Sequence, residues 1–191
     1  MIYDPKKHNR RSIRLQGYDY SQPGAYFVTL VTHRRACLFG EIVDGEMRLS
    51  DFGLIADECW RLIPEHFPTV ELGAFVTMPN HVHGIIILHD CQHLGTTDDH
   101  GTGTIYRART PAERFQKPTA GSIPTIIRTY KAAVTRRIGR KLNYTNIWQR
   151  NYYEHVIRTG DDHKRIHLYI ESNPANWSND DQNSEKSPLI L

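Results

Sequence analysis

Residues 78–88 read MPNHVHGIIIL, a tight turn signal followed by a run of apolar and β-branched residues. The run predicts a buried central strand from His81 to His89. Alternate side chains of a strand point to opposite faces, so His81 and His83 share one face. Two imidazoles at this spacing can hold one metal ion. Two ordinary histidines, each hydrogen-bonded locally at the end of a strand, are the alternative.

The flanking segments predict an α+β fold around this strand. Strands are expected over Ala25–Arg35 and Val70–Thr77 and at the start of Ile147–Arg158, and the second is expected to run antiparallel to the histidine strand. Three helices are expected. The first begins at a cap at Ser50 or Asp51, and the second covers Ser122–Leu142. The third runs from a cap at Asp161 or Asp162 to about Ser172, where Asn173-Pro174 ends it. Between the first strand and helix, Phe39–Leu49 contains a hairpin-type Asp44-Gly45 turn. The order suits a ferredoxin-like four-stranded antiparallel sheet with helices packed on one face.

The length of 191 residues suits one domain with extensions. We expect a basic N-terminal arm at 1–24, a folded domain at 25–177 with a mobile insertion at 90–120, and a polar tail at 178–191. No apolar run approaches the roughly 18 residues of a membrane span. We therefore expect a cytoplasmic protein with no membrane partner. The three cysteines form no CxxC pair, which argues against a zinc knuckle or a disulfide framework.

Basic residues are concentrated in two segments, although the net charge is only +3. Between Tyr106 and Lys141 there are ten Lys or Arg residues and one acid, Glu113. Tyr and Phe are interleaved with them, and Tyr130 and Phe115 could stack on unpaired bases. This pattern favours contact with a nucleic-acid backbone over a merely solvated face. The candidate DNA-binding residues are Arg10, Arg11, Arg14, Arg128, Lys131, Arg136, Arg137, Arg140 and Lys141.

Several segments together carry a family resemblance. MPNHVHGIIIL resembles the core motif of the HUH nucleases, in which two metal-binding histidines flank an apolar residue. The chain most resembles the single-tyrosine transposases of bacterial insertion sequences, and within them the transposases associated with repetitive extragenic palindromes (REP). The further matching segments span roughly residues 10–177, and they are GYDYSQPGAYFVTLVT, LFGEIVDG, IWQRNYYEHVIR and HLYIESNP.

The resemblance implies a site and a reaction. It assigns Tyr169 as the nucleophile that forms a 5′-phosphotyrosine link with single-stranded DNA next to a hairpin. It makes Asn173 the third ligand, with His81 and His83, of a divalent cation, Mg²⁺ or Mn²⁺. Spacing agrees, because positions i and i+4 share a helix face.

The sequence leaves alternatives open. Tyr152 and Tyr153 are rival nucleophiles, because they lie next to the Trp-Gln pair of IWQRNYYEHVIR. A catalytically inactive hairpin-binding protein of the same fold, or a metal-dependent phosphoesterase that uses water, would fit the same pattern. The resemblance leaves both a monomer and a homodimer open.

Overall fold

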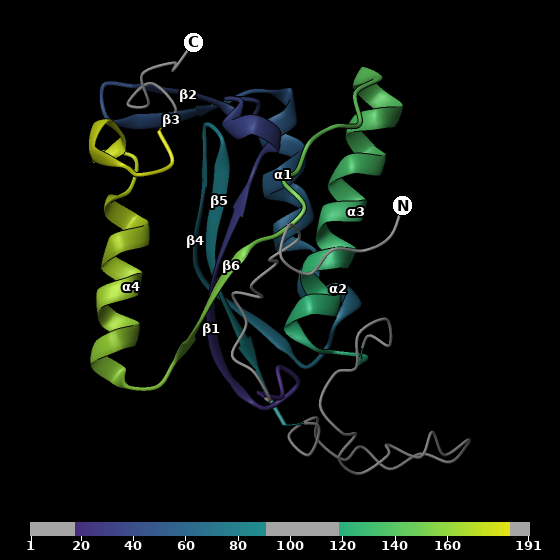
Figure 1. The fold of residues 1–191 in the computed structure, drawn as a ribbon, viewed down its shortest axis with the longest axis vertical. Coiled ribbons are helices and arrows are strands. Elements are labelled where there is room, and N and C mark those ends of the chain that lie inside the picture. Colours follow the sequence, from purple (N-terminus) through teal and green to yellow (C-terminus); the bar gives the residue numbers. More distant parts are fainter. Residues whose placement is uncertain (1–17, 91–118, 184–191) are drawn as a thin grey trace, which may run out of the picture.

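The computed structural model describes residues 18–90 and 119–183. Its centre is a four-stranded antiparallel sheet with the strand order β4-β5-β1-β6 (Figure 1). The strands are β1 (Gly24–Val31), β4 (Val70–Met78), β5 (His81–Leu88) and β6 (Tyr153–Ile157). The α+β class and the ferredoxin-like order are therefore confirmed. The N-terminal arm through residue 17, the insertion at 91–118 and the tail from 184 lie outside the described residues.

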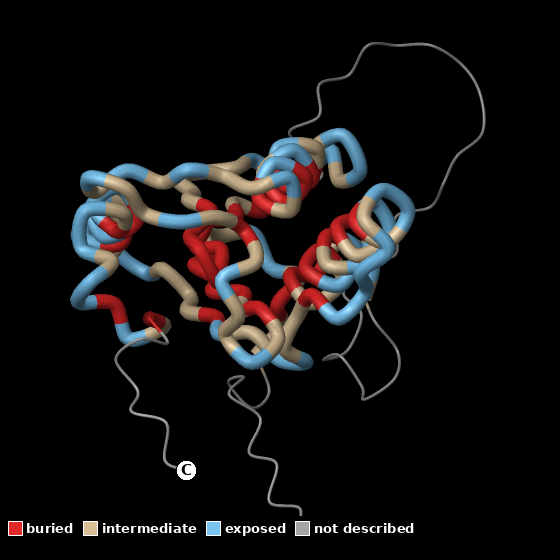
Figure 2. The backbone as a smooth tube through the Cα atoms, turned by 90° about the horizontal axis from the view of Figure 1, so that it is seen from above, coloured by how far each residue is buried: buried red, intermediate tan, exposed pale blue. Residues whose placement is uncertain are grey.

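One face of the sheet is covered by α1 (Asp51–Arg61), α2 (Ile63–His66) and α3 (Ile123–Leu142). Even-numbered residues of β1 and β5 point to this face, and three of them, Tyr26, Val28 and Ile86, are fully buried. The apolar stripe of α3 predicted from its spacing packs against them. Figure 2 shows the buried residues concentrated between the sheet and these helices. This layer forms the main core, and its members on α3 are Ile123, Ile126, Ile127, Tyr130, Val134 and Ile138.

The opposite face is covered in part by α4 (Gly160–Ser172). Ile166 and Ile170 pack there on Phe27 and Ile85, which form a second, smaller core. The expectation that all helices pack on one face is therefore wrong. Figure 1 shows α4, in yellow-green, on the side of the sheet away from α1 and α3. Two layers of apolar side chains on opposite faces of β1 and β5 require helices on both sides.

The boundaries differ from the sequence predictions in several places. The first strand ends at Val31, and His33–Arg35 forms a 3-10 turn with positive φ at Arg34 and Arg35. The last helix is capped by the Thr159 hydroxyl, which accepts a hydrogen bond from the Asp162 amide, and the aspartates lie in the first turn instead. The Asp44-Gly45 turn is confirmed, joining β2 (Gly40–Val43) to β3 (Glu46–Leu49). The Ser50 cap of α1 is confirmed as well.

No helix in residues 18–90 and 119–183 is long and apolar enough to cross a membrane.

Gly84, in the centre of β5, lets the sheet approach α1 closely. A Cβ atom built at this position would overlap the ring of the fully buried Trp60. We predict that Gly84→Ala lowers the free energy of unfolding by about 1–3 kcal/mol, the usual effect of overpacking a core. Urea denaturation measures this. Gly160→Ala is the matched control, because a Cβ there meets no atom of the described residues within 4 Å. Equal stability of the two variants would contradict the packing argument.

Candidate active site

His81 and His83 lie on the face of β5 that points toward α4, and the two residues are only 0% and 3% exposed. Each ring is oriented by a hydrogen bond at Nδ1. His81 Nδ1 is 2.8 Å from Asn80 Oδ1, and His83 Nδ1 is 2.9 Å from Thr29 Oγ1. Because the amide oxygen of Asn80 only accepts, His81 donates through Nδ1 and its Nε2 carries the lone pair. Metal-binding histidines are commonly oriented in this way.

Burial sets the charge state of both rings. It lowers the pKa of His81 to about 4, although the Asp180 carboxylate opposes the shift. It also lowers the pKa of His83 well below the ordinary value, and His81 adds to that effect. Both imidazoles are therefore neutral near pH 7, which is the form that binds a metal ion.

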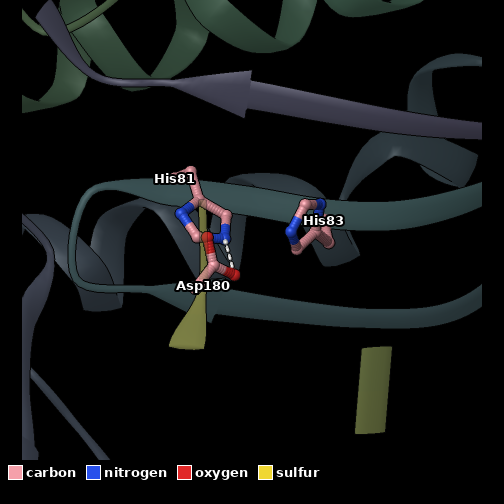
Figure 3. A group of neighbouring side chains, drawn as sticks. All are labelled: His81, His83 and Asp180. Carbon is pink, nitrogen blue, oxygen red and sulfur yellow. Dashed lines mark ion pairs between the residues drawn. The ribbon is translucent and has the colours of Figure 1, made fainter. Parts of the chain in front are cut away.

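A carboxylate completes a group with the two histidines. Asp180 follows the 3-10 turn η3 (Trp177–Asn179) and is itself buried. One ligand atom from each of His81, His83 and Asp180 lies within 4.8 Å of the others (Figure 3). His81 Nε2 is 3.9 Å from Asp180 Oδ2. These three buried residues can bind a metal ion, and sequence reasoning missed Asp180 because it lies in a segment that read as a polar tail.

Asn173, the ligand that the resemblance implied, lies beside this group at the C-cap of α4. Its Nδ2 donates to Asp180 Oδ2 over 3.1 Å. Its Oδ1 and His81 Nε2 are both buried, and neither has a hydrogen-bond partner within the described residues. Buried polar atoms without partners are costly, and a cation would satisfy both. Two neutral imidazoles with a carboxylate and an amide oxygen form a mixed nitrogen and oxygen donor set that fits a divalent cation.

Tyr169 is the tyrosine that the fold brings to the histidines. Its hydroxyl is 3.2 Å from His83 Nε2, and its ring lies edge-on to Phe27. The residue is 45% exposed, so the hydroxyl lies at the boundary between core and solvent. Partial burial raises the pKa of the phenol, and the Asp180 carboxylate raises it further. Without a cation at this site the phenol is therefore protonated at neutral pH.

The rival tyrosines are placed differently. Tyr152 packs against the main core. Tyr153 is opposite Thr29 in the sheet, and Thr29 is opposite His83, so Tyr153 points to the α4 face. Both line a cavity of about 710 Å³ that also contains His83, Tyr169 and Asp180. The cavity lies on the part of the sheet face that α4 leaves open, because α4 packs chiefly over β4 and β5.

The basic residues of α3 lie on the other side of the sheet from Tyr169. Exposed side chains are carried by Arg128, Arg136, Arg137, Arg140 and Lys141. Lys131 differs, because its Nζ donates to the carbonyl oxygens of Gln149 and Asn151, and burial lowers its pKa to about 8. A groove of about 670 Å³ lies beside Arg136, Arg140 and Arg150. Arg10, Arg11, Arg14 and Phe115 lie outside the described residues.

Comparison with known proteins identifies relatives. An uncharacterized protein of Haemophilus influenzae is 38% identical over 179 residues, which is 93% of this chain and 95% of the relative. The chain therefore belongs to the same family as that protein. No protein-family model matches the chain. Among solved structures, a REP-associated tyrosine transposase bound to a REP hairpin aligns with a TM-score of 0.56 and 21% identity, over 88% of this chain and 74% of the other. At this identity, the likeness establishes a shared fold.

The geometry around His81 predicts that Asp180 is a metal ligand. We expect Asp180→Asn to weaken Mn²⁺ binding at least 10-fold, because losing even an outer-shell partner of a metal ligand costs about 10–100-fold. Isothermal titration calorimetry with Mn²⁺ alone measures this. Asp181→Asn is the matched control, since this neighbouring carboxylate is outside the group. If Asn173→Ala weakens binding and Asp180→Asn does not, the ligand is the amide that the resemblance implied.

Proposed function

We propose that the protein is a metal-dependent single-stranded DNA endonuclease and strand transferase, transposase-like in its chemistry, that nicks and rejoins DNA next to hairpins through a 5′-phosphotyrosine intermediate. The observation that carries the proposal is the 3.2 Å approach of the Tyr169 hydroxyl to His83 Nε2, beside two neutral buried histidines and a carboxylate. A tyrosine hydroxyl at such a group has the position of a nucleophile. The shared fold with a hairpin-bound tyrosine transposase is consistent with it.

His81, His83 and Asp180 are the proposed ligands of a divalent cation, with Asn173 as an additional oxygen donor. When bound, the cation would polarise the scissile phosphate and favour the phenolate form of Tyr169. The chain supplies the remaining elements. Asn80 and Thr29 fix the imidazoles, Phe27 supports the Tyr169 ring, and the cavity admits the DNA strand from solvent.

The proposed reaction is a transesterification that balances without a nucleotide cofactor. Tyr169 Oη forms a bond to phosphorus as the bond from phosphorus to the 3′ oxygen breaks. The phenol proton is released, and in the net reaction the departing 3′ oxygen gains one. One phosphodiester is exchanged for another, so a 3′-hydroxyl can reverse the step and rejoin the strand.

Tyr169→Phe tests this proposal. We expect no covalent protein–DNA adduct from this variant with a hairpin carrying a single-stranded flank and Mn²⁺, while hairpin binding is retained. Denaturing gel electrophoresis detects the adduct, and mass spectrometry of the linked peptide identifies the tyrosine. Tyr152→Phe is the control variant and should still form the adduct. Hairpin binding by wild type without any adduct would indicate an inactive DNA-binding protein, and free cleaved ends without an adduct would indicate attack by water.

We further propose that the exposed arginines and lysines of α3, together with Arg10, Arg11 and Arg14, bind the DNA backbone. Reversing charge at Arg136 and Arg137 should weaken hairpin binding and flatten its salt dependence, because each lost phosphate contact in duplex DNA lowers the slope by about 0.9. Fluorescence anisotropy over a range of salt concentrations measures both. The control is reversal of Arg48 and Arg61, which makes the same change in net charge on β3 and α1. Equal losses of hairpin affinity in the two double variants would refute a specific DNA-binding surface on α3.

A further inference from the structure

We propose that Arg165 and Tyr153 form a subsite for an unpaired nucleotide next to the one that Tyr169 attacks: Arg165 binds its phosphate, and Tyr153 stacks on its base. This inference rests on the proposed function and extends it to the part of the cavity beyond the metal ligands.

Arg165 is one turn before Tyr169 on α4, and Asn173 is one turn after it. Residues four apart share a helix face and are separated by about 6 Å along the axis. Arg165, Tyr169 and Asp180 all line the same cavity. A DNA strand that places one phosphate at Tyr169 therefore passes the Arg165 guanidinium as it leaves along the helix.

Charge is distributed unevenly around the cavity. Asp180 and Asp181 line it where the metal group lies, whereas Arg165 lines it toward the start of α4, where the Asp162 carboxylate contacts both Arg165 and His155. Phosphates are repelled by the carboxylates unless a cation intervenes, and they are attracted by a guanidinium. The acidic end therefore suits a cation, and the basic end suits a DNA phosphate bound directly by the protein.

Asp162 holds the basic end in place. Its Oδ1 accepts a hydrogen bond from Arg165 Nη2 over 2.5 Å, and its Oδ2 is 2.7 Å from His155 Nε2. The hydrogen bond from His155 lowers the pKa of the Asp162 carboxyl, and Arg165 adds to the effect. The Arg165 side chain is still 75% exposed, and a guanidinium has five N–H donors, so donors remain available for a ligand. The guanidinium is thus oriented by the protein and open to solvent.

Tyr153, at the start of β6, supplies an aromatic surface to the same cavity. It is 47% exposed although it lies in a strand, and it makes an edge-on contact with Phe27 at 6.3 Å between ring centroids. It lies in the same row of the sheet as Thr29 and His83. An exposed ring on a rigid strand can stack on any base, and such stacking is the usual way that proteins hold single strands. Tyr153 and Tyr169 line the same cavity, so a base stacked on Tyr153 would lie within it.

Binding measurements separate this subsite from the chemistry. In a Tyr169→Phe background, which cannot form the adduct, we expect Arg165→Gln to weaken binding of a hairpin with a single-stranded flank about 10-fold or more, the usual effect of a lost charged hydrogen bond. The salt slope should fall by about 0.7, the value for one phosphate of a single strand. Tyr153→Leu should also weaken binding, whereas Tyr153→Phe, which keeps an aromatic ring, should bind as tightly as the protein with Tyr153. Fluorescence anisotropy gives all of these values.

Two controls define the outcome. Lys164→Gln removes a neighbouring positive charge of α4 that does not line the cavity, and it should leave both affinity and slope unchanged. A hairpin without the flank should bind all variants equally. The subsite is overturned if Arg165→Gln behaves like Lys164→Gln, or if the Arg165 effect persists without the flank. If Tyr169-containing protein forms no adduct while the Arg165 effect is present, the proposed chemistry fails and the subsite stands.

Discussion

The packing of α4 on the open face of the sheet is the contact on which the site depends. Ile166 and Ile170 are buried against Phe27 and Ile85, and burial of an isoleucine typically contributes about 1.5–3 kcal/mol. These apolar contacts fix the rotation of the helix about its axis. Tyr169 lies between the two isoleucines in sequence, and it points along the sheet toward His83. Without this small second core, the histidines would face solvent and the tyrosine would have no defined partner.

The same packing explains why the histidines are neutral and oriented. α4 and the turn after it remove water from His81 and His83, and desolvation lowers both pKa values. Asn80 and Thr29 then determine which ring nitrogen is available. Within the described part of the chain, this arrangement leaves His81 Nε2 and Asn173 Oδ1 buried without hydrogen-bond partners. Buried polar atoms left without partners commonly indicate a ligand, and here their chemistry fits a divalent cation.

The sheet separates two regions with different roles in the proposed function. The exposed cations of α3 lie on one side, and Tyr169 with its cavity lies on the other. Gln149 borders both the α3 groove and the cavity, so the segment after α3 connects them at the edge of the sheet. Lys131 holds this segment through hydrogen bonds to two of its carbonyl oxygens. This structural role of Lys131 could not be predicted from its position in a basic stretch of sequence.

Local pattern determined much of the fold. Alternation around His81 and His83 predicted their shared face, helical spacing predicted α3 and its buried stripe, and the turns at Asp44-Gly45 and Asn173-Pro174 were readable because their backbone chemistry is local. Only the tertiary structure decided which face α4 covers, because its two isoleucines would suit either side of the sheet. It also decided that Asp180 joins the histidines. That residue is distant from them in sequence and polar in its surroundings, and its burial follows from long-range packing that no local pattern records.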